Sequence, residues 1–559
     1  MVRATTILHR ARERRTDLAV LALLSVWVGA LYHRVLGMWW TADDPMVLWY
    51  VHRFGPSDYF FDPETWRSFN AASLTPWMHL SFDADLAIFG LSPGGYYLHQ
   101  LIALAAAAWA LYFCLRFYVS VVPAAAGALG LAASPAMAEI SGFLATRHYP
   151  EGLVFACVSF ALFVASIRRR NWRLAAFAAI FYCLALTAKE IYAPLPLMLV
   201  LLPEGELYNR LKRILLFVPA VAGYVWWRGL MLDSMAGGYR DRLSPTCDEL
   251  SAWANGVVGG TLSPQFALAV ILVLSVSGSV VLLVRSRPDW RAFWVVFGAS
   301  AIIPVIPVLH VYSPRHSLGP AILVAVVFAM LVQRAVQSSP GIVPRWIEIF
   351  AGALALVIAG AYATTQVPLH EQTQRIRAEG EEVLRGDDPR VTVATPAMPY
   401  WHFFGLLQLR HEVLNLGTGP GVVNDLCLLD PVDDDASMDL GHRVVFDPAS
   451  GNLVKKAQNR ECRIDEKASL SVDIEFDSGT TVWRLGPYST GRYTVLWAIS
   501  ENSLIGIDVP AMGSQRGNIA FEMGVDMVVA YQSLDGWTAI SPRLAGVPRA
   551  AAMHVRWSR

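Results

Sequence analysis

Long apolar runs constrain this chain more than any other feature. Segments of about 20 mostly apolar residues recur up to position 365, and in lipid only a helix or a closed barrel satisfies every backbone N–H and C=O group. We expect about eleven membrane-spanning helices, of which the sixth is short and either re-entrant or merged with its neighbour. The expected spans are 18–37, 97–119, 121–138, 151–167, 173–188, 191–202, 213–232, 266–284, 292–309, 318–333 and 346–365.

The composition agrees with a membrane protein. Hydrophobic residues make up 55% of the 559 positions and charged residues only 16%, against roughly 25% charged residues in soluble proteins. Lys plus Arg and Asp plus Glu balance at 45 each, so net charge does not indicate a nucleic-acid partner.

The distribution of Lys and Arg among the loops predicts the orientation. Residues 1–17 are rich in Arg, and every second loop after them is basic, including 168–173, 210–213 and 285–291. The loop 38–96 has only two Arg residues against seven Asp and Glu residues. We therefore expect a cytoplasmic N-terminus, with this first long loop on the opposite side. The apolar run is too long, and lacks a clean small-residue cleavage site, for a signal peptide.

The sequence changes character after Thr365. Short alternating runs appear at 390–394, 443–446, 469–476, 491–498 and 526–531, and turn pairs such as Ser450-Gly451 separate several of them. This pattern predicts a soluble, extracytoplasmic domain over 367–559 that is β-rich with mixed α/β structure. Cys427 and Cys462 fall in this domain and could form a disulfide in an oxidising compartment.

Four polar groups fall at the predicted outer ends of the helices, where burying ionisable side chains is costly. Each group also has an ordinary structural explanation. In the order in which the groups are named below, these are an acidic loop that caps the next helix, an Arg147–Glu139 pair at the interface, a local Lys–Glu pair, and an interfacial anchor. The groups are Asp43-Asp44, Glu139 with Arg147-His148, Lys189-Glu190, and the segment from His310 to Arg315-His316.

Taken together, the four groups suggest one chemistry. Arg and Lys bind phosphate oxygens, so cations that converge at a membrane interface suit the phosphate of a lipid headgroup. A nearby carboxylate suits the removal of a proton from an acceptor hydroxyl, and Asp43 with Asp44 could also hold a divalent cation.

The chain resembles the GT-C superfamily of membrane glycosyltransferases over about residues 18–335. The resemblance rests on Asp43-Asp44 after the first helix, on the stretch from Leu74-Thr-Pro76 through Phe89 to His99, and on Leu186-Thr-Ala-Lys189-Glu190 before Pro194. Ser134-Pro135 through Glu139 and Arg147-His148 add to it. It is similar to the protein O-mannosyltransferase and aminoarabinose transferase branches. The resemblance implies a catalytic module over 18–366 that includes the loop 38–96.

The resemblance also implies roles for individual residues. Asp43, or Asp44 if the register slips by one, would be the catalytic base or a metal contact. Lys189 would bind the donor phosphate, with Arg147 and His148 in the same headgroup site and Arg315 as a further contact. Glu139 would orient the cations, and Glu190 and His99 would support the site.

The implied reaction is an inverting transfer of a sugar from a polyprenyl-phosphate donor to a hydroxyl of a lipid, glycan or protein acceptor. We expect it at a bacterial inner membrane, with 367–559 in the periplasm or outside the cell. Unlike the mannosyltransferase branch with TPR repeats, this chain has no helical repeat in its outer domain, which leaves the acceptor open. The main rival function is a lipid or solute transporter or flippase, although the notable charges sit at helix ends and not at the bilayer midplane.

Overall fold

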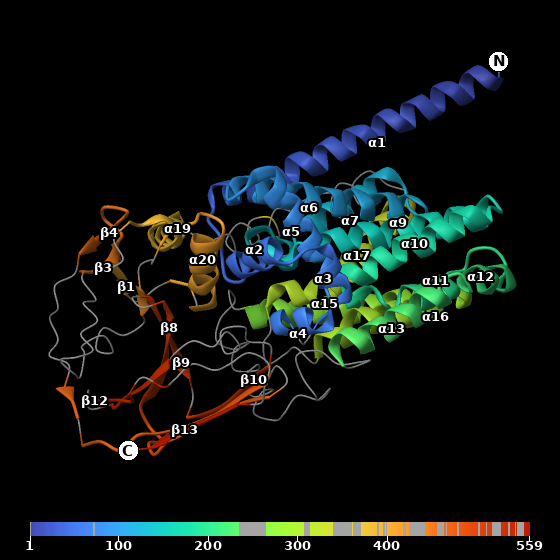
Figure 1. Ribbon diagram of the computed structural model, residues 1–559. Helices are drawn as coiled ribbons and strands as arrows, with labels where there is room; N and C mark the ends of the chain where they lie inside the picture. The colour runs from blue at the N-terminus through green and yellow to red at the C-terminus, as the bar shows by residue number, and fades with distance from the viewer. Residues whose placement is uncertain are drawn as a thin grey trace. The chain divides into compact units, whose positions relative to one another are not determined.

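The computed structural model forms two compact units (Figure 1). The membrane unit contains Met1–Leu36, Ser73–Met78 and Gly94–Val367, and the sheet unit contains Gly37–Ala72, His79–Pro93 and Pro368–Arg559. Each unit is described by itself. The residues described are 2–70, 73–233, 264–306, 313–338, 360, 370–387, 391–394, 397–398, 400–417, 421–423, 442–455, 463–465, 467–477, 480–500, 503–509, 511–516, 527–534, 537–542, 544 and 553–558.

The membrane unit is helical throughout its described residues. Helix α5 (Pro76–Phe89) starts in this unit and continues into the sheet unit. The other helices are α1 (Val2–Tyr32), η1 (His33–Gly37), α6 (Pro93–Arg116), α7 (Val121–Ala132), α8 (Pro135–Gly142), η2 (Leu144–Thr146), α9 (His148–Arg168), α10 (Trp172–Ala188), η3 (Glu190–Tyr192), α11 (Leu195–Leu201), α12 (Leu207–Ile214), α13 (Val218–Leu232), α15 (Pro264–Arg285), α16 (Pro288–Ile302), η5 (Pro314–Ser317) and α17 (Leu318–Ser338).

Six of these helical segments are long and apolar enough to cross a membrane, which supports an integral membrane protein. Helices α7 and α8, bent by 52° at their junction, are together apolar and long enough for a broken span or a re-entrant loop. The expected spans 173–188, 191–202 and 266–284 are helical but include shorter apolar stretches. The expected span 346–365 lies outside the described residues, apart from Gly360.

The expected span 121–138 corresponds to two helices separated by a bend. Helix α7 ends at Ala132 and α8 begins at Pro135, so the crossing is broken. Proline disfavours helical backbone in the residue before it and brings no N–H of its own. Ser134 accordingly has extended backbone, and its hydroxyl accepts the N–H of Met137 at 3.3 Å.

Small residues set the packing of the membrane unit. A Cβ atom on Gly127 of α7 would lie 2.8 Å from the carbonyl oxygen of Ala325 in α17. Helix α10 buries Ala175, Ala178 and Ala185, and it lies beside α9 (Figure 1). Because lipid supplies no hydrophobic force between helices, close approach of backbones through small side chains is what stabilises such pairs.

The sheet unit contains both helices and strands. Its helices are α2 (Asp44–Arg53), α3 (Pro56–Phe61), α4 (Pro63–Phe69), α19 (His370–Arg385) and α20 (Tyr400–Glu412). Its strands are β1 (Val391–Ala394), β2 (Gly421–Val423), β3 (His442–Asp447), β4 (Asn452–Lys455), β5 (Arg463–Ile464), β6 (Ser471–Asp477), β7 (Thr480–Gly486), β8 (Arg492–Ser500), β9 (Ser503–Val509), β10 (Met512–Arg516), β11 (Met527–Gln532), β12 (Trp537–Ile540) and β13 (Met553–Ser558).

The strands form two sheets. The larger has the order β4-β3-β1-β2-β9-β8-β11-β12-β5, and its β1 pairs in parallel with both β2 and β3. The smaller has the order β10-β7-β6-β13 and is antiparallel. Side chains of β6, β7, β8 and β11 share one apolar core that includes Val472, Trp483 and Val529. The predicted fold class, a mainly helical membrane region followed by a β-rich α/β region, is confirmed.

Candidate functional site

Asp43 and Asp44 stand at the start of helix α2 in the sheet unit and have different surroundings. Asp43 is the N-cap residue, its carbonyl accepts the N–H of Val47 at 3.0 Å, and its side chain is exposed. Asp44 is fully buried, and its Oδ2 accepts the N–H of Thr41 at 2.9 Å and the Thr41 hydroxyl at 3.2 Å. Asp44 therefore closes the turn, while Asp43 presents its carboxylate at the surface of the unit.

Lys189 is a single extended residue between α10 and η3 in the membrane unit. It is half-buried, and its Nζ lies 5.1 Å from the centroid of the Tyr149 ring, which is a cation–π distance. Among the residues that the structure describes, no carboxylate lies within ion-pair distance of this ammonium group.

Glu190 does not form the local pair with Lys189 that we considered as the ordinary alternative. Its Oε1 accepts Nε–H of Arg228 at 2.7 Å and the Tyr224 hydroxyl at 3.2 Å, both from α13. The Arg228 side chain is 5% exposed, so Glu190 neutralises a charge that would otherwise be costly to bury. The carboxylate of Glu190 therefore does not neutralise the charge of Lys189.

Glu139 of α8 connects to η5 through three hydrogen bonds. Its Oε2 accepts the backbone N–H of Arg315 at 2.6 Å, and its Oε1 accepts Nη1–H of Arg315 at 2.8 Å and the Ser313 hydroxyl. The predicted orienting role of Glu139 thus has a geometric basis, with Arg315 as the cation. His316 follows directly, and its Nδ1 accepts the N–H of Ser313 at 3.2 Å. His310 and Tyr312 lie outside the described residues.

These groups meet around the buried Tyr149. The charges of Arg315, Glu139 and Glu190 all act on its hydroxyl, and the charges of Arg315 and Lys189 both act on His316. We call this set the Tyr149 cluster. It consists of Glu139, Tyr149, Lys189, Glu190, Arg228, Arg315 and His316, drawn from α8, α9, the α10–η3 junction, α13 and η5.

Arg147 has a different environment from the one we expected. Its side chain is completely buried, and its guanidinium donates to Gln100 Oε1 at 3.2 Å and to the carbonyl of Tyr96 at 2.9 Å. Its Nη1 also lies 3.3 Å from His99 Nδ1. These contacts fix α6 to the start of α9, and the headgroup role of Arg147 stays a prediction. His148, its neighbour, is also buried.

His99 links Arg147 to a carboxylate. Because a guanidinium only donates, the Nδ1 of His99 must accept, which leaves the proton on Nε2. That nitrogen lies 3.4 Å from Oε1 of Glu151, whose Oε2 accepts Nε1–H of Trp77 at 2.9 Å. The predicted supporting role of His99 therefore consists of orienting Glu151 and Arg147 at the first turn of α9.

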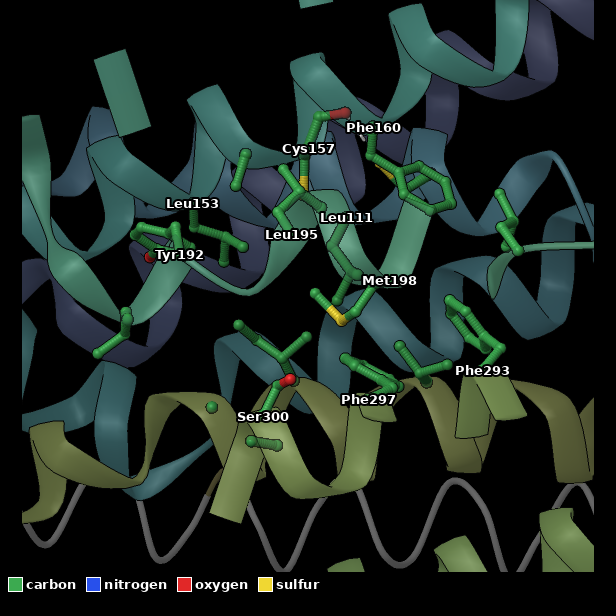
Figure 2. Close-up of a pocket in the computed structure, with 18 of the residues that line it drawn as sticks. Leu111, Leu153, Cys157, Phe160, Tyr192, Leu195, Met198, Phe293, Phe297 and Ser300 are labelled. Carbon is green, nitrogen blue, oxygen red and sulfur yellow. Dashed lines mark hydrogen bonds between the residues drawn. The ribbon is translucent and has the colours of Figure 1, made fainter. Parts of the chain in front are cut away.

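The membrane unit contains an apolar cavity (Figure 2), and His316 of the Tyr149 cluster is part of its lining. Its volume is about 200 Å³, and its lining comes from α6, α9, α11, α16 and α17. Figure 2 shows Leu153, Met198 and Phe297 around it. His316 and Tyr192 are among its few polar lining residues, and Tyr192 donates its hydroxyl to the carbonyl of Tyr149 at 2.6 Å. The cavity therefore meets the cluster through these two side chains.

The structure brings together one part of the expected site. Lys189, Glu190, Glu139 and Arg315 lie in a single cluster, although their sequence positions are far apart. Arg147, His148 and His99 lie in the same unit, and Asp43 and Asp44 belong to the sheet unit.

Sequence reasoning missed Arg228, Tyr149 and Glu151. Arg228 is a lone cation inside the apolar run of α13, and an intramembrane charge of this kind is a functional candidate by default. The sequence alone could therefore have identified Arg228 as a candidate. Tyr149 and Glu151 had no distinguishing pattern beyond following Arg147-His148.

The residues fit a metal site poorly. Oδ2 of Asp44 accepts two hydrogen bonds from Thr41 and Asp44 is buried, whereas Asp43 is exposed. Throughout the described ranges, no group of three or more His, Cys, Asp or Glu side chains is gathered as a protein-held cation needs. We derive no step through a metal.

No protein-family model matches the chain, and no curated protein matches it. Among solved structures, it aligns with the oligosaccharyltransferase of Archaeoglobus fulgidus at 12% identity and a TM-score of 0.46, covering 70% of this chain and 63% of that one. It aligns with ArnT from Cupriavidus metallidurans bound to undecaprenyl phosphate at 12% identity and a TM-score of 0.45, covering 77% and 92%. It aligns with the mycobacterial arabinofuranosyltransferase AftD at 15% identity and a TM-score of 0.40, covering 68% and 29%.

These three proteins are GT-C glycosyltransferases, the superfamily that the sequence resembles. The chain spans less than two thirds of the length of the archaeal enzyme. TM-scores below 0.5 at these identities carry neither a substrate nor a residue role to this chain.

Proposed function

We propose that this protein is a membrane glycosyltransferase that takes its sugar from a polyprenyl-phosphate donor. The observation that carries the proposal is the apolar cavity that meets the Tyr149 cluster, in which Lys189 has no carboxylate partner among the described residues. A prenyl tail needs an apolar space between helices, and the phosphate at its end needs cations at the edge of that space.

The charge of the cluster suits a phosphodiester. Lys189, Arg228 and Arg315 supply three cations, while Glu139 and Glu190 supply two carboxylates. One positive charge is left over, and a polyprenyl-phosphate sugar carries one negative charge. When the bond between sugar and phosphate breaks, the phosphate gains a second negative charge. Lys189 and Arg315 then stabilise that leaving group, which lowers the barrier to transfer.

Asp43 is the proposed general base. It would accept the proton of the acceptor hydroxyl as that oxygen attacks the anomeric carbon from the face opposite the phosphate, which inverts the configuration. Asp43 is exposed, whereas Asp44 is buried in the turn, and this difference selects Asp43.

Arg147, His148 and His99 have supporting roles in this proposal. They fix the first turn of α9, from which Tyr149 contacts Lys189. The acceptor is an alcohol on a lipid, glycan or protein. The distribution of Lys and Arg supports an orientation with residues 367–559 on the non-cytoplasmic side, which in a bacterial inner membrane is the periplasm.

Binding of undecaprenyl phosphate to the full-length protein in lipid nanodiscs tests the phosphate site. Lys189→Ala should weaken binding about 10- to 100-fold, the value of one lost hydrogen bond to a charged group at roughly 1.5–3 kcal/mol. Lys189→Arg should recover most of it. Lys212→Ala is the matched control, because Lys212 also lies over a tyrosine ring, with Nζ 4.2 Å from the centroid of Tyr208, but outside the cluster. Equal affinities for Lys189→Ala and Lys212→Ala would contradict the assignment.

Transfer itself is tested with radiolabelled polyprenyl-phosphate sugars and a membrane extract as acceptor. Asp43→Asn should abolish covalent transfer and leave undecaprenyl phosphate binding unchanged. Full activity in this variant would exclude Asp43 as the base. Movement of the lipid across vesicle membranes without any covalent product would instead favour a flippase and reject the enzyme.

A further inference from the structure

Helix α20 of the C-terminal region packs against helix α2, which begins with Asp43 and Asp44. Both helices belong to the sheet unit, although they are more than 350 positions apart in the sequence. At the far end of α2, Arg53 Nη1 lies 3.0 Å from Glu412 Oε1. In the middle, the rings of Trp49 and Phe404 meet edge to face with centroids 5.9 Å apart.

The contact is closest at the first turn of α2. A Cβ atom on Gly405 would lie 2.6 Å from the backbone nitrogen of Met46 and 2.6 Å from the carbonyl carbon of Pro45. Real Cβ atoms do not approach backbone atoms this closely, and backbone cannot move aside as a flexible side chain can. Glycine at 405 therefore allows α20 to lie directly on the two residues that follow Asp44.

The turn before α2 is held in an unusual conformation. Ala42 has φ of 43°, in the left-handed region that residues with a Cβ atom rarely adopt. Its N–H donates to Sδ of Met398 at 3.4 Å, just before α20. His402 of α20, four residues after Met398, is fully buried. A conformation of this kind persists only where its surroundings enforce it.

We infer that α20 and Met398 are a positioning device for the proposed base: Met398 and Gly405 hold the Thr41–Asp44 turn so that Asp43 is exposed and Asp44 is buried. This inference rests on the proposed function and adds positioning residues to it. If the support were lost, Ala42 would relax to negative φ, and the direction of the Asp43 carboxylate would change with it.

Glycine substitutions in the full-length protein test the inference. Gly405→Ala should lower kcat for sugar transfer about 10- to 100-fold, as expected when a catalytic group is displaced by about 1 Å. Its affinity for undecaprenyl phosphate should not change, because the phosphate is held in the membrane unit. Gly417→Ala is the control, since a Cβ atom there meets nothing within 4 Å, and it should keep the kcat of the wild type.

A suppressor separates positioning from general stability. Met398→Leu removes the acceptor for the N–H of Ala42 and should lower kcat. Adding Ala42→Gly should restore part of that loss, because glycine adopts positive φ without support. No recovery in the double variant would mean that Met398 acts on something other than the conformation of the turn.

Thiol labelling gives a readout that does not depend on activity. A membrane-impermeant maleimide should label Asp43→Cys faster than Asp44→Cys, with the wild type as the background for native cysteines. In the Gly405→Ala background, labelling of Asp44→Cys should rise several-fold. Unchanged labelling together with unchanged kcat would overturn the role of α20. Changed labelling in a protein that transfers no sugar would confirm the positioning of the turn and reject the proposed function instead.

Discussion

Glu139→Gln is the substitution whose effect the structure defines most closely. The carboxylate uses one oxygen for the backbone N–H of Arg315 and the other for the guanidinium of Arg315 and the hydroxyl of Ser313. Glutamine offers a single acceptor oxygen, so its NH₂ group must face one of the Arg315 donors. The variant loses a charge-assisted hydrogen bond and sets two donors against each other.

The size of the effect follows from distance and exposure. At 2.8 Å the ion pair would be worth about 6 kcal/mol at an effective dielectric constant of about 20. The two side chains are 26% and 23% exposed, so water screens the pair and the desolvation of both charges opposes it. We expect a net loss of about 2 kcal/mol, close to the value of one hydrogen bond between charged groups.

Thermal unfolding of the purified protein in detergent measures this loss. Glu139→Gln should lower the midpoint by several degrees. The matched control is Glu381→Gln in α19, which breaks a pair with Arg377 of similar length, 2.9 Å, but with side chains 59% and 40% exposed. Exposed pairs at this helical spacing contribute roughly 0.3–0.5 kcal/mol. If the two substitutions lowered the midpoint equally, the structural role of Glu139 would be refuted.

Three further outcomes are expected. Burial lowers the pKa of His402 to about 3 from its ordinary 6.5. The contribution of this residue to the free energy of unfolding is therefore fully present above pH 6.5 and falls by about 2 kcal/mol at pH 5. The free energy of unfolding of His402→Phe should lack this pH dependence. Gly127→Ala should destabilise by about 1–3 kcal/mol because its Cβ would meet the backbone of α17, whereas Gly223→Ala, with nothing within 4 Å, should stabilise by up to about 1 kcal/mol in a denaturation series. Met198→Trp should fill the cavity and weaken binding of undecaprenyl phosphate in nanodiscs, but not of a phosphate ester with a short chain; equal losses for both would place the tail elsewhere.

Hydrophobic patterning predicted most of the helices, and for a physical reason. In lipid a spanning segment has few alternatives to a helix, so length and polarity nearly decide its structure. The break between α7 and α8 was also readable in principle, because Pro135 forces Ser134 out of helical backbone. Strands β3, β6, β8 and β11 followed from alternation. The short parallel strand β2 did not, because three residues are too few to show a period.

The site was predicted only as a set of residue types. Lys189 stood out because its side of the membrane is otherwise poor in cations. The partners of each charge could not be read in the same way. Glu139 pairs with Arg315, which is 176 positions away, and Glu190 pairs with Arg228, which is 38 away. From the sequence, Arg147 and Lys189 are nearer candidate partners for Glu139 and Glu190. The packing of α8, η5 and α13 determines which ion pairs form.

The contact between α2 and α20 has a consequence for the order of assembly during synthesis. Ala42 emerges from the ribosome at the start of the chain, but the sulfur atom that receives its N–H belongs to residue 398. Closing so long a loop has to wait until nearly three quarters of the protein has been made and its helices inserted. A chain that stopped before α20 would keep every predicted membrane crossing and still lack the support for its acidic turn. Completion of the C-terminal region would then be the event that fixes the conformation of this turn.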